Sequence, residues 1–237
     1  MRIEELAYHQ TRLGALLLRR RPEPLIGNKD VFEVKLGDEF LMSSLFTEGE
    51  AELANLGLNG LTGKLDVVIG GLGLGYTAAA ALDHECVGSL LVIDAFEEVI
   101  GWHRGGLVPM GERLSIDRRC EMRKGDFFDL SAKSFDDTDP DRQFDVVLLD
   151  IDHSPRHFLD DKNGRFYTSA GLEELAGQLR PDAVFALWSN DPAETEFTAL
   201  LESVFGDASS ENIEFRNPYS GGVAINSVYV ARKLGEE

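Results

Sequence analysis

The sequence predicts an α/β fold in which a doubly wound, mostly parallel sheet follows a small β region. From Leu65 onward, continuous apolar runs of strand length alternate with amphipathic segments of helix length. Runs that are apolar on both faces are typical of parallel strands covered by helices on each side. A glycine-rich loop follows the first of these runs, and the segment before it is strand-like. We therefore expect a small β-hairpin region over residues 1–60 and a doubly wound domain over residues 61–237.

The N-terminal region is predicted to contain two or three strands that lead into one helix. Its strand-like runs, RLGALLLRR and KDVFEVKLGDEFLMSS, span residues 12–20 and 29–44, and Gly37-Asp38 can turn a hairpin within the second. The segment from Thr47 to Glu50 has the S/T-x-x-E form of a capping box. AELANLGL follows it with helical spacing, so we expect a helix to begin there.

Five apolar runs are the candidate strands of the main sheet. They are LDVVIG, LLVIDA, CEMRKGDF, FDVVLLD and AVFALWS, at residues 65–70, 90–95, 120–127, 144–150 and 183–189. AGLEELAGQLRPD supplies a helix before the fifth strand, and VYVARK is a candidate for a late strand. Because crossovers between parallel strands are right-handed, these elements predict a doubly wound sheet.

Composition narrows the class of protein. The chain has 237 residues, of which 43% are apolar, enough to bury a sizeable core. Its 23 basic and 42 acidic residues give a net charge of −19, which excludes phosphate-backbone binding as the main activity and disfavours anionic membranes. The acid excess is equally compatible with a salt-adapted or GC-rich proteome, with no bearing on function. We expect a small-molecule partner, neutral or cationic, and neither nucleic acid nor membrane.

Cysteine usage and the chain start predict a soluble cytoplasmic protein. Cys86 and Cys120 are too few for a disulfide framework and form no CxxC or Cys/His cluster, so no metal is expected. The N-terminal MRIEELAYHQ lacks the apolar run of a signal peptide. The longest uncharged stretch, Val67 to Leu82, is shorter than the ~20 residues that a bilayer requires.

The glycine-rich loop predicts a nucleoside ligand. Glycines directly after a strand permit a tight turn and let a ligand approach the backbone at the start of the next helix. Gly71, Gly73 and Gly75 give G-x-G-x-G, the spacing associated with S-adenosylmethionine-type nucleosides. The dinucleotide pattern G-x-G-x-x-G counted from Gly71 is broken by Tyr76. The alternative is that the glycines have only a structural role, in the turn that connects the strand to the next helix.

Acids at the next two strand ends extend this prediction. Asp94 ends the second strand, where a carboxylate can hydrogen-bond both hydroxyls of a ribose. Asp126 and Phe127 end the third, where the acid can accept from the exocyclic amine of adenine while the ring packs on the base. Each acid alone is compatible with a helix cap or a solvated strand end. Together with the glycine loop, they follow an order that one adenosyl ligand can span.

The fourth strand leads into an acidic loop that predicts an amine site. Asp150 and Asp152 would point to one face if both are extended, because strand residues alternate. One carboxylate can hold an ammonium while the other assists its deprotonation, since only a neutral amine attacks a sulfonium carbon. The alternative is a capping Asp150 and a solvated Asp152. Trp188, after the fifth strand, either lines the substrate cleft or packs in the core.

Residues 65–190 resemble the spermidine synthase family of aminopropyltransferases, which share the class I methyltransferase fold. The matching motifs are VVIGGLGLG, LLVIDA followed by EEVI, GDFF, FDVVLLD and FYTSAGLEELAGQLRPDAVFALWS, and KLGDEFLMSS looks like the small N-terminal β domain of that family. The resemblance implies a Rossmann-like catalytic domain and transfer of an aminopropyl group from decarboxylated S-adenosylmethionine to putrescine or a similar polyamine. It also implies a homodimer and no prosthetic group.

The resemblance assigns roles residue by residue. It implies that Asp94 holds the ribose, that Asp126 takes the adenine amine and that Asp150 is the catalytic aspartate. The aspartate of the family motif GGGDGG, which lies near the aminopropyl amine, falls at Gly73. The second acid of the catalytic loop falls at His153.

Two further features bear on the acceptor. Asp152 stands one residue before the position of the missing acid and is a candidate substitute, so Asp152, His153 and Trp188 are candidate substrate-binding residues. The family also supplies a tyrosine from its N-terminal region to the pocket, whereas no Tyr or His occurs here between Leu41 and Gly75.

Three functional hypotheses follow. The first is a spermidine synthase-like transferase that moves an aminopropyl group from decarboxylated S-adenosylmethionine to a polyamine or another amine. The second is a small-molecule methyltransferase that uses S-adenosylmethionine, because Gly73 replaces the aspartate. The third is a catalytically silent module that retains the nucleoside pocket.

Overall fold

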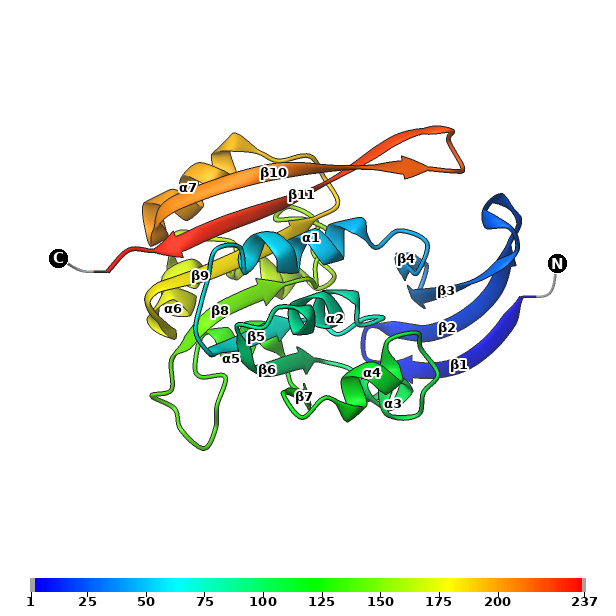
Figure 1. The fold of residues 1–237 in the computed structure, drawn as a ribbon, viewed down its shortest axis with the longest axis horizontal. Helices are drawn as coiled ribbons and strands as arrows, with labels where there is room; N and C mark the ends of the chain where they lie inside the picture. The colour runs from blue at the N-terminus through cyan, green and yellow to red at the C-terminus, as the bar shows by residue number, and fades with distance from the viewer. Residues whose placement is uncertain (1–2, 236–237) are drawn as a thin grey trace.

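The computed structural model describes residues 3–235 and contains two β-sheets (Figure 1). The N-terminal sheet is antiparallel throughout and has the order β1-β2-β3-β4. Its strands are β1 (Glu4–Thr11), β2 (Gly14–Glu23), β3 (Lys29–Leu36) and β4 (Glu39–Ser43), with a 3-10 turn η1 (Pro24–Ile26) between β2 and β3. The hairpin expected at Gly37-Asp38 is present between β3 and β4.

The expectation of two or three N-terminal strands was wrong, because there are four. The additional strand, β1, carries the polar sequence EELAYHQT and none of its residues is fully buried. Backbone hydrogen bonds to β2 hold this strand in place. Because it does not depend on burying one face, its sequence lacks the alternation of apolar and polar residues that identifies a half-buried strand.

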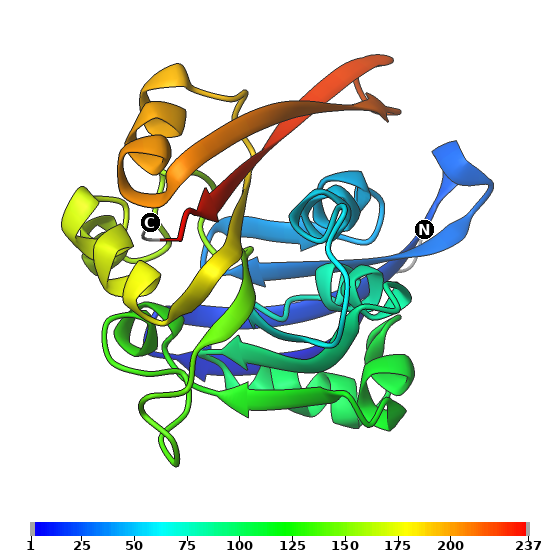
Figure 2. The ribbon, with the colours of Figure 1, turned by 60° about the vertical axis from the view of Figure 1, so that its left-hand side comes forward.

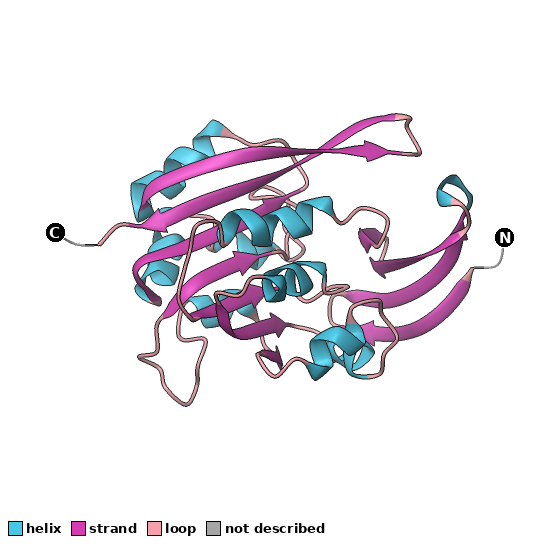
Figure 3. Ribbon diagram, viewed as in Figure 1, coloured by secondary structure: helices cyan, strands magenta, loops and turns pink. Residues whose placement is uncertain are grey.

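The larger sheet has seven strands and confirms the predicted fold class. The order is β10-β11-β9-β8-β5-β6-β7, in which the five central and lower strands are parallel and β10 and β11 are antiparallel (Figures 1 and 3). The strands are β5 (Leu65–Gly70), β6 (Val87–Asp94), β7 (Cys120–Lys124), β8 (Phe144–Leu149), β9 (Leu179–Ser189), β10 (Gly206–Asn217) and β11 (Gly222–Lys233). All five apolar runs form the parallel strands, and the late run lies within β11.

Helices cover both faces of this sheet (Figure 2). They are α1 (Glu48–Gly57), α2 (Tyr76–Asp83), α3 (Glu97–Arg104), α4 (Gly111–Ile116), α5 (Phe127–Ser131), α6 (Ser169–Gly177) and α7 (Thr195–Phe205), with a 3-10 turn η2 (Asp161–Arg165). Successive residues of a strand pack against opposite helix layers. Val67 belongs to the apolar core under α1, α2 and α3, and Val68 to the core under α5, α6 and α7. This arrangement explains the uninterrupted apolar runs.

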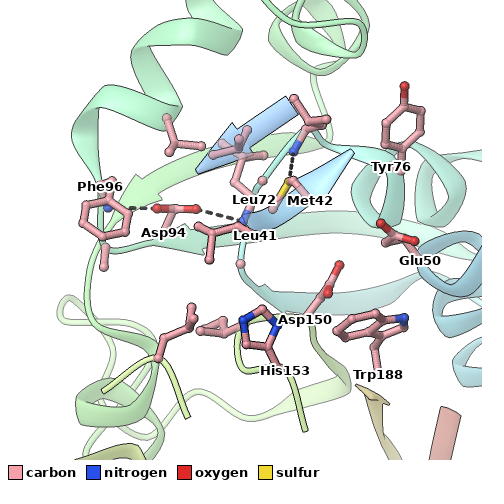
Figure 4. Close-up of a pocket in the computed structure, with 18 of the residues that line it drawn as sticks. Leu41, Met42, Glu50, Leu72, Tyr76, Asp94, Phe96, Asp150, His153 and Trp188 are labelled. Atoms are coloured by element: carbon pink, nitrogen blue, oxygen red, sulfur yellow. Dashed lines mark hydrogen bonds between the residues drawn. The ribbon is translucent and has the colours of Figure 1, made fainter. Parts of the chain in front are cut away.

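The helix α1 begins where the sequence indicated but without the expected capping box. Thr47 is at the N-cap position, yet its side chain makes no capping hydrogen bond. The Thr47 N–H donates to Glu48 at 3.0 Å and not to Glu50, whose carboxylate faces a cavity (Figure 4). The helix packs against α2, β9 and β11, so it lies on the larger sheet rather than on the N-terminal one. The domain boundary at residue 60 stays a prediction.

Two C-terminal elements were not expected from the sequence, namely α7 and β10. The sequence of β10, GDASSENIEFRN, is polar, and its extended form follows from an unbroken register with β11. The hairpin of β10 and β11 projects beyond the sheet toward the N-terminal region (Figure 1). At its turn, the Tyr219 hydroxyl donates to Glu23 at 2.6 Å and accepts from Arg21 at 2.6 Å. Within residues 3–235, no helix combines the length and apolarity needed to cross a bilayer.

Candidate functional site

A cavity of about 470 Å³ lies at the carboxyl edge of the parallel strands. The loops after β5, β6, β7 and β8 form its floor, and β4, the start of α1 and the hairpin of β10 and β11 contribute from above. Its size is within the range of pockets for small molecules and cofactors. The strand order separates Asp126, after β7, from Asp150, after β8, with the glycine loop and Asp94 between them.

The three glycines of the loop adopt conformations that other residues rarely do. Gly71, Gly73 and Gly75 have φ values of 92°, 49° and 90°. A Cβ at Gly71 would collide with the carbonyl oxygen of Asp150. At Gly73, a Cβ would lie 2.5 Å from the methyl carbon of Met42, so Met42 occupies the space where the resemblance places an aspartate. At these three positions the loop therefore presents backbone alone to the cavity.

Asp94 anchors the loop and faces the cavity. Its Oδ2 accepts from the Leu72 N–H at 3.0 Å and its Oδ1 from the Phe96 N–H at 2.8 Å (Figure 4). Burial raises the pKa of Asp94, and these backbone donors partly offset the rise. A carboxylate has about four lone-pair sites, so acceptor capacity remains for a ligand hydroxyl.

Asp126 is a helix cap and an ion-pair partner as well as a cavity residue. Its Oδ1 accepts from the backbone N–H of Phe128 at 3.1 Å, at the N-terminus of α5. Its Oδ2 lies 2.5 Å from Lys162 Nζ and 3.7 Å from Arg12. Phe127 is buried to 2% exposure, and its ring lies directly under Gly70. The structure thus brings both residues to the cavity, with Phe127 also part of the aromatic core.

Asp150 lies at the end of β8 and points into the cavity (Figure 4). Thr77, on the first turn of α2, donates its hydroxyl to Asp150 Oδ2 at 2.8 Å. Burial raises the pKa of Asp150 to about 6, and the Thr77 hydrogen bond opposes that shift. A carboxyl group in this range can exchange a proton near neutral pH.

Glu50 is a site residue that the sequence analysis missed. It faces Asp150 across the cavity, beside Tyr76 and Trp188 (Figure 4). Burial, followed by the charge of Asp150, raises the pKa of Glu50 to about 8. Glu50 was not predicted as a site residue because it occupies the N3 position of a capping-box pattern, where a glutamate normally accepts a hydrogen bond from the backbone of the N-cap residue. Tyr76, which broke the dinucleotide pattern, supplies a tyrosine to the pocket from α2.

The structure does not bring Asp152 to the cavity, contrary to the expectation that it shares a face with Asp150. The extended strand ends at Leu149, three residues before Asp152, so strand alternation no longer relates Asp152 to Asp150. Asp152 is 2% exposed, and its oxygens accept from the Leu159 N–H at 2.7 Å, from Asn163 at 3.0 Å and from the Tyr167 hydroxyl at 2.9 Å. Through these hydrogen bonds, the buried Asp152 side chain holds the loop after β8 in place.

His153 and Trp188 do line the cavity. The Nε2 atom of His153 lies 3.4 Å from a Glu39 carboxylate oxygen on β4. Trp188 is half-buried and packs directly against Gly49 of α1, where any side chain would collide with the indole. Both alternatives for Trp188 therefore hold, since the indole packs in the core and borders the cavity.

The charges of the cavity are unevenly arranged. Among the residues that the structure describes, Arg12 is the only Lys or Arg that lines it, and Arg12 is paired with Asp160 at 3.1 Å near Asp126. Glu50 and Asp150 lie at the other end, and no basic side chain within residues 3–235 comes within salt-bridge distance of them. In the described part of the chain, no group of three His, Cys, Asp or Glu side chains could hold a metal ion.

Comparison with known proteins shows a fold similarity without a detectable sequence relationship. No family model matches the sequence, and no curated protein does. Among solved structures, a spermidine synthase in complex with the transition-state analogue AdoDATO is 18% identical, with a TM-score of 0.72 over 97% of this chain and 74% of that one. The spermidine synthase from Thermotoga maritima is 18% identical, with a TM-score of 0.71 over 97% and 73%.

A third structure agrees with these two. A probable spermidine synthase from Corynebacterium glutamicum ATCC 13032 is 14% identical, with a TM-score of 0.63 over 98% of this chain and 81% of that one. The chain therefore has the fold of spermidine synthases, including the small N-terminal sheet.

Proposed function

We propose that this protein is a transferase that binds a sulfonium nucleoside of the S-adenosylmethionine type and moves an alkyl group from it to an amine. The observation that carries the proposal is one cavity that joins the glycine loop, Asp94, Asp126 and Asp150 in strand order. In this arrangement Asp94 would hold the ribose and Asp126 the adenine, and Asp150 would receive the acceptor amine. The fold shared with a spermidine synthase that binds AdoDATO supports it.

The cavity favours a donor without a carboxylate, and hence aminopropyl transfer. The N–H of Leu72 donates to Asp94, and that of Leu74 lies 3.1 Å from Met42 Sδ. Arg12, the basic residue of the cavity, is engaged at the far end by Asp126 and Asp160. A donor carboxylate would meet Asp150 and Glu50 instead, and a charge buried without a partner is costly. Decarboxylated S-adenosylmethionine, with two positive charges, fits this environment.

The proposed chemistry is a direct displacement. Asp150 accepts the proton of the bound ammonium, and the neutral amine nitrogen attacks the methylene carbon next to the sulfonium. The new C–N bond forms as the C–S bond breaks, and the C–S electron pair stays on sulfur as the thioether nucleoside leaves. The alkylated amine keeps its positive charge, so the proton taken up by Asp150 is the only one released. Holding the nitrogen about 3–3.5 Å from the carbon, in line with the C–S bond, would supply much of the acceleration.

Calorimetric titration with both donors tests this proposal. We expect decarboxylated S-adenosylmethionine to bind at least tenfold more tightly than S-adenosylmethionine. Asp94→Ala should weaken nucleoside binding at least tenfold, with thermal unfolding measured in parallel because the change also removes acceptors from Leu72 and Phe96. Exclusive binding of the carboxylated donor would contradict aminopropyl transfer, and absence of binding to both would contradict the nucleoside site.

Methyl transfer is the second candidate, and one observation favours it. Met42 fills the space beside Gly73, so the loop supplies no carboxylate for the amine of an aminopropyl group. Incubation with S-adenosylmethionine carrying a labelled methyl group distinguishes the candidates, because label recovered in an amine product would establish methyl transfer.

A further inference from the structure

The carboxyl groups of the cavity that have neither a basic partner nor a neighbouring backbone N–H donor in the described residues lie at one end. Glu50 and Asp150 face each other there, and we call this region the amine end (Figure 4). The other acids that line the cavity are engaged: Asp126 and Asp160 by Lys162 and Arg12, and Asp94 by backbone N–H groups. Among the described lining residues, one location is therefore suited to an ammonium.

Aromatic side chains border the same location. Tyr76 and Trp188 flank Glu50, with the indole ring beside Asp150 and its nitrogen directed away (Figure 4). A cation next to an aromatic face gains an attraction that is larger when water is excluded. The amine end thus offers Asp150 to the acceptor nitrogen and Glu50 to the ammonium of a decarboxylated donor, with two aromatic rings beside them.

Next to the amine end lies a largely apolar wall without charged side chains, which we call the apolar wall; a Cβ at Gly49 would touch both the Trp188 indole of the amine end and the Asn226 amide of this wall. Phe46, before α1, and Phe215, on β10, line the cavity with their ring centroids 5.6 Å apart. Ala224 lines it from β11, opposite Phe215 in the hairpin register. The polar groups of this wall are neutral amides, and Asn226 donates to Asn190 at 3.3 Å.

This distribution discriminates between acceptors by charge. A linear diamine held at the amine end would carry its second ammonium toward the apolar wall, where no carboxylate compensates for lost hydration. An alkyl or aryl arm of the same length would gain free energy from burial there. The same wall that rejects the dication therefore accepts an apolar arm.

We propose that the acceptor of this site is a primary monoamine with an apolar arm, and not a linear diamine or polyamine. This inference rests on the proposed function, because it takes the cavity to be the site of amine alkylation. It differs from what the resemblance implies, since putrescine would be a poor acceptor.

A matched pair of amines tests the inference. n-Pentylamine and putrescine have the same number of non-hydrogen atoms and differ in whether the far end is a methyl or an ammonium group. Each is titrated calorimetrically into the full chain with and without 5′-methylthioadenosine, and each is assayed as acceptor with decarboxylated S-adenosylmethionine. We expect n-pentylamine to bind at least tenfold more tightly and, with turnover, to have the higher kcat/KM. Equal or tighter binding of putrescine, or no binding of either amine, would overturn the inference.

The readouts separate this inference from the proposed function. Binding of n-pentylamine without nucleoside binding or turnover would support the amine site and contradict the transferase proposal. Nucleoside binding with a preference for putrescine would do the opposite.

A charge placed on the apolar wall provides a second test. Ala224→Asp adds a carboxylate at a half-buried position of β11, and we expect it to shift the preference at least tenfold toward putrescine. Ala224→Asn is the matched control, since it adds similar volume without charge and should leave the preference for n-pentylamine. An unchanged preference in a folded Ala224→Asp variant would argue that the diamine arm does not reach this wall. The wild-type comparison stands even if that variant fails to fold.

Discussion

The hydrogen bond from Thr77 to Asp150 sets the proton affinity of the proposed base. It is 2.8 Å long, starts from a buried residue, and opposes the effect of burial on the Asp150 pKa. Thr77→Val keeps the shape of the side chain and removes the donor, so we expect the Asp150 pKa to rise by about one unit.

The acidic limb of the pH dependence of kcat/KM reports this shift. It should move to higher pH in Thr77→Val. Thr198→Val, on α7, serves as the control, because its hydroxyl bonds to Glu194 and Ser210 outside the cavity. An unshifted limb in Thr77→Val would mean that Asp150 is not the group whose ionisation controls the rate.

Glu50 links the amine end to stability. Burial and Asp150 raise its pKa from an ordinary value of 4.5 to about 8, so the folded chain binds this proton more tightly than the unfolded chain. The resulting stabilisation is complete below about pH 4.5 and is lost as the pH rises through 8. Glu50→Gln removes this titratable group. The melting temperature should therefore fall less steeply between pH 5 and 8 in this variant than in the wild type.

Comparison at the two ends of this range supplies the control. The variant should gain melting temperature relative to the wild type at pH 8 and much less at pH 5, because pH 5 lies close to the ordinary pKa of 4.5 and most of the stabilisation is lost above it. Parallel curves for the two proteins would show that Glu50 ionises normally in the fold.

At the scale of elements, the hairpin of β10 and β11 joins the two sheets above the cavity. Tyr219, at its turn, bonds to Glu23 and Arg21 of β2, and its ring lies 6.2 Å from Phe46. The Tyr219 and Arg21 hydrogen bonds hold the pKa of Glu23 at about 2, so the cluster is charged across the physiological range. The hairpin supplies Phe215 and Ala224 to the apolar wall, so its position controls the acceptor end.

Tyr219→Phe should loosen this hairpin. We expect faster amide hydrogen exchange over residues 215–224 and an increase of about threefold or more in acceptor KM, with donor affinity unchanged. Tyr8→Phe, at an exposed tyrosine of β1, is the matched control. Equal changes in donor and acceptor binding would indicate a general loss of structure rather than a local one.

The hairpin also marks where prediction from the sequence ends. The parallel strands were predictable because burial on both faces leaves continuous apolar runs such as LDVVIG, which coincides with β5. The polar strands β1 and β10 were not, since their extended form depends on partners distant in sequence. The same holds in the site: Asp150 follows directly from a strand end, whereas Glu50 and Thr77 face it only through the packing of α1 and α2.

At the scale of the whole molecule, the net charge of −19 means that many acidic side chains have no basic partner. Many basic residues form ion pairs with nearby acids: on β2, Arg19 pairs with Glu33 at 2.6 Å and Arg20 with Glu4 at 2.7 Å. The surplus acids therefore repel one another over the surface, which destabilises the compact state. They also raise the local concentration of cations, including a cationic donor and acceptor.

Salt should act on these two effects in opposite directions. The screening length falls from about 30 Å at 0.01 M to about 10 Å at 0.1 M salt, so repulsion among surface acids weakens over this range. We expect the melting temperature to rise by about 2–4 °C, equivalent to about 1 kcal/mol, because exposed ion pairs contribute little that salt can remove. Over the same range, KM for both cationic substrates should increase. An uncharged osmolyte controls for solvent effects, and a melting temperature that falls with salt would show that local ion pairs outweigh the repulsion.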